Sequence, residues 1–261
     1  MDKRVIFSDG GKGGVGKSIV SIALVDYLLT KDGTTLLIDA DTTNPDVERL
    51  FHAHPGVIAQ LYDLRDEDDV FSFLSVFEEQ ADNVDTVVIN LPACFDFSQH
   101  MDTAIELFKA LQFEVWAFFT INRQADSINL LGNSLTRGLL SRVDAAVVVR
   151  NGFFGADHVF ERFEESKAKT QLLQQGGQVI YLPELFHRSL DQCLLEKKIT
   201  FSEASRHEIQ LVYRFQIGRW IASVHQSFDR VFAHATGQPV NTSPSKKATQ
   251  STPEEAAHES E

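Results

Sequence analysis

Cysteine is scarce in this chain of 261 residues, which contains only Cys94 and Cys193. Neither cysteine belongs to a CxxC pair, which argues against a disulfide framework, an iron–sulfur site or a zinc knuckle. We therefore expect both to be thiols buried in the core. The nine histidines also lack the spacing of metal ligands.

Long apolar runs are absent as well. No stretch of 18 or more apolar residues occurs, so the sequence predicts no membrane-spanning helix. The first residues lead into a short apolar run and a glycine-rich loop without the pattern of a secretory signal peptide. The acidic C-terminal end lacks the basic amphipathic stretch of a membrane-surface anchor. We expect a cytoplasmic protein with no membrane contact.

Basic residues are outnumbered, since 24 Lys and Arg stand against 37 Asp and Glu and give a net charge of −13. Affinity for nucleic acid depends largely on neutralising phosphates, so the charge does not support DNA contact except through a local basic patch. Residues 237–261 are rich in Ser, Thr, Pro and Glu without aliphatic periodicity, and we expect a disordered acidic tail there. Residues 1–236 are expected to form one domain.

Short apolar runs alternate with longer amphipathic segments. The runs are continuous stretches of Val, Ile, Leu and Phe, typical of parallel strands buried on both faces. The alternation predicts a three-layer α/β fold, with helices on both faces of a mostly parallel sheet of about six to eight strands. The predicted strands are Arg4–Ser8, Thr35–Asp39, Thr86–Leu91, Val115–Ile121, Ala145–Arg150 and Gln178–Leu182. The predicted helices are Lys17–Thr30, Pro45–Ala53, Asp66–Gln80, Phe97–Leu111, Ser127–Leu140, Phe154–Gln175 and Glu208–His234.

A glycine-rich loop follows the first predicted strand and matches the pattern G-x-x-x-x-G-K-[ST]. Such a loop turns its backbone N–H groups toward a phosphate, and the helix that follows adds the positive end of its dipole. Its lysine can reach the β- and γ-phosphates, and its serine hydroxyl can ligate Mg²⁺. The sequence therefore predicts a P-loop NTPase fold that binds ATP with Mg²⁺. The residues expected around the nucleotide are Gly11, Lys12, Gly13, Gly14, Val15, Gly16, Lys17, Ser18 and Ile19.

A second lysine, Lys12, distinguishes this loop from an ordinary one. The run Gly-Gly-Lys-Gly-Gly-Val-Gly-Lys-Ser at residues 10–18 resembles the deviant Walker A motif of the ParA/MinD ATPases. That family includes plasmid partition ATPases, the division-site ATPase and nitrogenase iron protein. Its early lysine crosses the interface of a nucleotide-sandwich homodimer and touches the partner's phosphates. The resemblance implies that role for Lys12, next to a catalytic Lys17.

Two carboxylates, Asp39 and Asp41, end the second predicted strand. They are two residues apart, so a continuing strand would point both to the same side. In the family the second aspartate of such a pair orients the attacking water near Mg²⁺. The resemblance implies that catalytic role for Asp41 and a supporting role near the metal for Asp39. The alternative is that both aspartates only cap the end of the strand.

The segment Val87–Ala93 resembles the family's Walker B strand, except that Asn90 replaces the usual aspartate. A neutral carbonyl is a poorer Mg²⁺ ligand than a carboxylate. Asn90 still stands with Ser18, Asp39 and Asp41 in the expected metal site. Three interpretations remain open: Asp39 compensates, hydrolysis is slow, or the chain binds ATP with little turnover.

Base recognition is expected at the ends of later strands. In the family an asparagine after the strand that corresponds to Ala145–Arg150 reads the adenine edge, and Asn151 takes that place. A side-chain amide offers both a donor and an acceptor. Pro183 follows a later strand and resembles the family segment that lines the base pocket. Asn122 is a competing candidate, and Asn151 could instead belong to a turn before Gly152.

The resemblance implies an ATP-binding molecular switch. It would form a homodimer with ATP, hydrolyse ATP slowly with Mg²⁺ and position plasmid DNA, a conjugation or mobilisation complex or another cargo through a protein partner. One alternative is a metabolic enzyme of the same superfamily, such as a dethiobiotin-synthetase-like ligase or a small-molecule kinase, which would release phosphate only with its metabolite. Another is a nucleotide-sensing module with little hydrolysis, in which Asn90→Asp would gain turnover.

Overall fold

The computed structural model describes residues 3–31, 33–95, 99–185, 194 and 196–235. Within these residues seven strands form one sheet in the order β3-β2-β4-β1-β5-β6-β7, and every neighbouring pair is parallel. The predicted α/β fold is confirmed. The strands are β1 (Arg4–Asp9), β2 (Thr35–Asp39), β3 (Val57–Leu61), β4 (Thr86–Asn90), β5 (Glu114–Ile121), β6 (Ala145–Asn151) and β7 (Gln178–Leu182).

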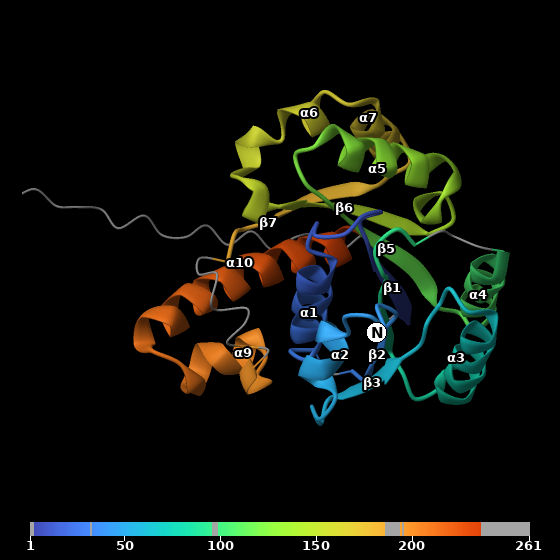
Figure 1. Cartoon of the computed structure of the whole chain (residues 1–261), viewed down its shortest axis with the longest axis horizontal. Coiled ribbons are helices and arrows are strands. Elements are labelled where there is room, and N and C mark those ends of the chain that lie inside the picture. Colours follow the sequence, from blue (N-terminus) through green and yellow to red (C-terminus); the bar gives the residue numbers. More distant parts are fainter. Residues whose placement is uncertain (1–2, 32, 96–98, 186–193, 195, 236–261) are drawn as a thin grey trace, which may run out of the picture.

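Helices pack on both faces of the sheet and give three layers (Figure 1). Alternate residues of β1 show the division, because Val5 and Phe7 join one core cluster while Ile6 joins the other. The first face carries α3 (Glu67–Gln80), α4 (Gln99–Ala110), α5 (Ala125–Arg137), α6 (Glu161–Glu164) and α7 (Lys167–Gln174). The second face carries α1 (Lys17–Leu28), α2 (Asp46–Phe51), α9 (Phe201–Glu203) and α10 (Leu211–Ala235).

The structure corrects the single helix predicted over Phe154–Gln175. That segment starts at the last residue of one 3₁₀ turn, Gly152–Phe154, and contains a second, Asp157–Val159, followed by α6 and α7. Gly155 has a φ of 133°, which only glycine adopts without strain. Ser166 then starts α7, because its side chain accepts a hydrogen bond from the Lys169 N–H.

Cys94 also differs from its prediction. It lies in the loop after β4 with a φ of 54° and is exposed rather than buried in the core. The loop leaves the carboxyl edge of the sheet, where core packing ends. Cys193 and the predicted tail, 237–261, lie outside the described residues. Among the helices that the structure describes, none has the combined length and apolarity of a membrane span.

Candidate functional site

The predicted phosphate loop joins β1 to α1 at the carboxyl edge of the sheet. Gly11, Gly14 and Gly16 have φ values of 67°, 70° and 101°, a region that side chains with a Cβ rarely adopt. Gly16 is the N-cap of α1, and Lys17 is its first residue. The unpaired N–H groups of the first turn of α1 therefore point toward this loop. The arrangement is that of an anion-binding cradle.

Lys17 is held inside the loop. Its ammonium group donates a hydrogen bond of 2.9 Å to the Lys12 carbonyl, and only 7% of the residue is exposed. Burial lowers the pKa of Lys17, and the neighbouring carboxylates of Asp9 and Asp41 oppose that shift. A bound phosphate would supply further negative charge beside the ammonium group. Ser18 and Ile19 are half-buried in the same turn, and Val15 is fully buried.

A buried polar network joins the two strands next to the loop. Asn90 donates from Nδ2 to Asp39 Oδ1 at 2.9 Å, and its Oδ1 accepts from the Ser21 hydroxyl at 2.9 Å. Asp39 Oδ1 also accepts from the Asp41 N–H at 3.2 Å. Its Oδ2 accepts from the N–H groups of Val47 and Glu48, both at 3.1 Å. Asp39 therefore ties β2 to β4 and to the start of α2.

This network bears on the expected metal site. Asp39 is 0% exposed, and each of its oxygens already accepts two hydrogen bonds. Burial raises the pKa of Asp39, while the hydrogen bond from Asn90 and those from the backbone lower it. These contacts favour a supporting role for Asp39 over direct coordination. Ser18 and Asp41 are both half-buried and remain the more accessible metal candidates.

Asn151 reaches the phosphate loop from the end of β6. Its Nδ2 donates to the Val15 carbonyl at 2.7 Å, and its Oδ1 accepts from the Phe153 N–H at 3.0 Å. A Cβ on Gly16 would lie 2.2 Å from this Nδ2. Asn151 thus positions the loop, and one donor and one acceptor of its amide remain for a base.

The other two base candidates have different surroundings. Asn122 is 5% exposed, and its Oδ1 accepts from the Gln124 N–H at 2.9 Å. Pro183 is half-buried, and its carbonyl accepts from Trp220 Nε1 at 2.8 Å. Neither contact involves the phosphate loop, so Asn151 is the candidate that the structure brings directly to it.

Lys12 is anchored within its own chain. Its ammonium group donates to Gln124 Oε1 and to Asp126 Oδ2, each at 2.7 Å. The hydrogen bond from Lys12 lowers the pKa of Asp126. These partners lie at the start of α5. A lysine that reaches a second subunit would first have to leave them.

Asp9 is a site residue that sequence reasoning missed. Its Oδ1 accepts from the N–H groups of Gly10 and Gly11 at 2.6 and 3.0 Å, and it is 8% exposed. Burial raises the pKa of Asp9, while these backbone hydrogen bonds and Lys17 lower it. An aspartate followed by two glycines is a recognisable turn signal, which could have identified it. Asp9 shapes the entry to the loop.

Asp9→Asn is expected to stabilise the protein by roughly 1 kcal/mol at pH 7, the scale of a buried polar group's desolvation. The amide oxygen can keep both hydrogen bonds, and a buried charge is removed. Because the folded pKa of Asp9 is raised, its contribution to stability is complete below about pH 3.8 and is lost as the pH rises through the folded pKa. Urea unfolding from pH 4 to 8 should show the variant's advantage growing with pH. A variant less stable than wild type at pH 7 would contradict this account.

Comparisons with known proteins indicate the family of the chain. The model for the CobQ/CobB/MinD/ParA nucleotide binding domain matches residues 6–186. Protein MobD of Acidithiobacillus ferrooxidans is 32% identical over 222 residues, which are 84% of this chain and 94% of that protein.

Solved structures share the fold at low sequence identity. In the MinC:MinD cell division complex of Aquifex aeolicus, the matching chain has a TM-score of 0.54 and 15% identity, over 94% of this chain and 98% of that one. The septum site-determining protein MinD of Pyrococcus horikoshii, complexed with Mg-ADP, has a TM-score of 0.54 and 14% identity, over 89% and 98%.

Proposed function

The chain belongs to the CobQ/CobB/MinD/ParA family of nucleotide-binding domains, and from this membership we propose that it is an ATP-dependent molecular switch. Two chains close on ATP to form a homodimer, and slow hydrolysis separates them. The observation that carries the proposal is Lys12, a second lysine at the mouth of the phosphate loop whose ammonium group lies on the surface of α5 rather than in the loop. The fold of the Mg-ADP complex supports the same nucleotide class.

The residues around the loop have different roles in nucleotide binding. The glycine backbone and Lys17 would hold the β- and γ-phosphates, and the Ser18 hydroxyl and Asp41 would hold Mg²⁺, which would supply charge neutralisation. Asp41 orients the attacking water. Asn151 keeps the loop in shape through its hydrogen bond to Val15.

Hydrolysis is proposed to be slow because of Asn90. The neutral amide is committed on one side to Asp39 and on the other to Ser21. Asp39 is itself saturated with hydrogen bonds, so it does not replace the missing carboxylate near the metal. Asp41, whose carboxylate acts on the charge of Lys17, is then the acidic candidate left for the metal. A long-lived ATP-bound dimer follows from this arrangement.

Lys12→Ala is expected to abolish ATP-dependent dimerisation while the chain still binds ATP, because Lys17 and the glycine backbone remain. Light scattering with ATP, ADP and no nucleotide measures the mass, and a fluorescent ATP analogue measures binding. Lys167→Ala, which removes an exposed lysine from the start of α7, is the matched control and should dimerise like wild type. Dimerisation that needs no ATP and survives Lys12→Ala would overturn the proposal.

The cargo is proposed from the family resemblance. A relative at 32% identity is named MobD, and a structural neighbour is a complex with a partner protein, MinC. We therefore favour a cytoplasmic protein partner within a plasmid partition, conjugation or mobilisation complex, and the net charge of −13 makes direct DNA binding the weaker route. ATP turnover and mass, measured with and without DNA, separate the two routes.

A further inference from the structure

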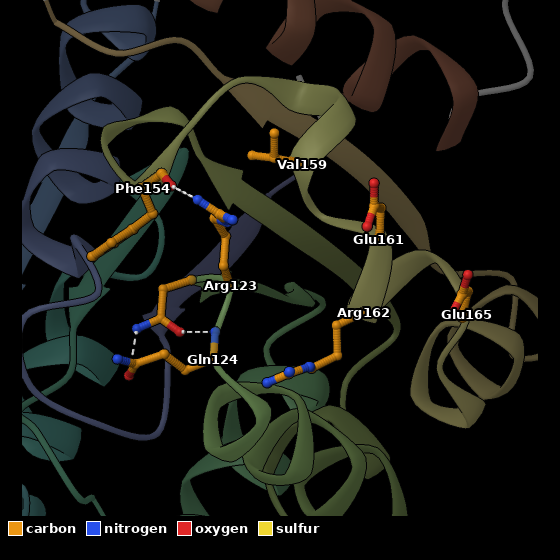
Figure 2. Close-up of a pocket in the computed structure, with 8 residues that line it drawn as sticks. Arg123, Gln124, Phe154, Val159, Glu161, Arg162 and Glu165 are labelled. Carbon is orange, nitrogen blue, oxygen red and sulfur yellow. Dashed lines mark hydrogen bonds between the residues drawn. The ribbon is translucent and has the colours of Figure 1, made fainter.

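A cavity of about 640 Å³ opens beside the residues that hold Lys12 (Figure 2). It lies between the end of β5, the turn after β6 and helix α6. Its lining includes Arg123, Gln124, Phe154, Glu161, Arg162 and Glu165. Gln124 is shared with the Lys12 anchor, so the cavity and the second lysine of the loop occupy one continuous surface.

The rim of this cavity carries charges of both signs, two arginines and two glutamates. All four residues are exposed. Arg123 donates from Nη1 to the Phe154 carbonyl at 3.4 Å. Figure 2 shows the carboxylates of Glu161 and Glu165 turned away from both guanidinium groups. Within the described part of the chain, none of these four side chains forms an ion pair.

Neighbouring charges in the same segment do pair within the chain. Arg150 contacts Asp157 at 2.9 Å and Glu164 at 2.8 Å. Glu164 also pairs with Lys169. The segment therefore contains enough opposite charges to form ion pairs, and yet the four rim side chains form none with one another. They are arranged so that they do not meet one another within one subunit.

We propose that this rim is an interface between two copies of the chain, in which the arginines of one copy pair with the glutamates of the other. A two-fold interface sets the same patch against itself, so the patch must be self-complementary. Two arginines and two glutamates meet that condition. The inference rests on the proposed ATP-dependent dimer and names the side chains that align it.

The charge of the whole molecule points the same way. Each copy carries −13, so two copies repel one another across most of their surfaces. The rim is balanced, with two positive and two negative side chains beside Lys12. Exposed ion pairs add little affinity, but opposed like charges strongly disfavour a contact. The rim therefore determines how the two copies are aligned, and it adds little to the affinity between them.

Charge reversal tests the proposal. One chain carries Arg123→Glu and Arg162→Glu, and the other carries Glu161→Lys and Glu165→Lys. With a non-hydrolysable ATP analogue, each chain alone should dimerise at least about tenfold more weakly than wild type, because like charges then face each other. An equimolar mixture should recover the dimer as a heterodimer, since every pair is then opposite. Analytical ultracentrifugation measures all three samples.

A matched control separates pairing at the rim from the effect of the change in net charge alone. Glu78→Lys with Glu79→Lys makes the same charge change on the exposed surface of α3. This chain should dimerise alone and should not rescue the arginine-reversed chain. A misfolded chain would not be rescued by mixing either, so recovery in the mixture decides the question.

The outcomes also separate this inference from the proposed function. A wild-type chain that stays monomeric with ATP overturns both. A wild-type chain that dimerises, together with reversed chains that dimerise equally well or mixtures that do not recover, overturns the rim interface alone.

Discussion

Asn90→Asp is expected to destabilise the protein by about 3 kcal/mol at neutral pH rather than to restore rapid hydrolysis. Asn90 Nδ2 donates to Asp39 Oδ1 at 2.9 Å, and the two residues are 1% and 0% exposed. The substitution replaces the donor with a second carboxylate in a buried site. One of the two acids would have to keep a proton or leave the network.

The expected effect depends on pH. The new carboxyl has a raised pKa in the folded state, so the variant approaches wild-type stability below about pH 4 and loses it as the pH rises. Urea unfolding at several pH values measures this loss. Asn83→Asp adds the same charge at an exposed position and is the control. Combining Asp39→Asn with Asn90→Asp leaves the pair with one carboxylate, as in wild type. The double variant should therefore recover part of the lost stability. Faster ATP turnover with unchanged stability would favour the nucleotide-sensing alternative.

Gly16→Ala should distort the phosphate loop far more than Gly14→Ala. Both glycines have positive φ, but a Cβ on Gly16 would lie 2.2 Å from Asn151 Nδ2, whereas a Cβ on Gly14 meets nothing within 4 Å. We expect Gly14→Ala to cost about 1 kcal/mol of backbone strain. Gly16→Ala should cost about 3 kcal/mol, because the loop or Asn151 must also move, and it should abolish ATP binding.

A double-mutant cycle isolates the contact between Gly16 and Asn151. Asn151→Ala removes the atom that the new Cβ would strike, at the expense of the hydrogen bond to Val15. The double variant Gly16→Ala with Asn151→Ala should therefore be more stable than the sum of the single changes predicts. Thermal unfolding of the four proteins gives the coupling. Additive effects would show that backbone strain, not this contact, accounts for the loss.

The continuous apolar runs predicted six of the seven strands, because a strand buried on both faces leaves a plain pattern. The strand they missed, β3, lies at the edge of the sheet and is only partly buried, with Ile58 and Leu61 exposed. The helix predicted over Phe154–Gln175 failed because its apolar spacing outweighed Gly155 and the Ser166 cap.

The candidate site divides in a similar way. The backbone of the phosphate loop was predictable, since glycine spacing encodes it directly. The side-chain contacts were not, because their partners are distant in sequence. Lys12 meets Gln124 and Asp126, which lie 112 and 114 residues later. No spacing rule connects such residues before the sheet brings β1 and β5 side by side.

The hydrogen bond between Val15 and Asn151 spans 136 positions. A chain synthesised only as far as β4 contains every residue of the phosphate loop but lacks the side chain that fixes its shape. Contacts of such long sequence separation are slow to form, because the chain between them must first be brought together. The loop therefore reaches its working conformation only after β6 has joined the sheet, and we expect a chain whose synthesis has not passed β6 to bind nucleotide weakly.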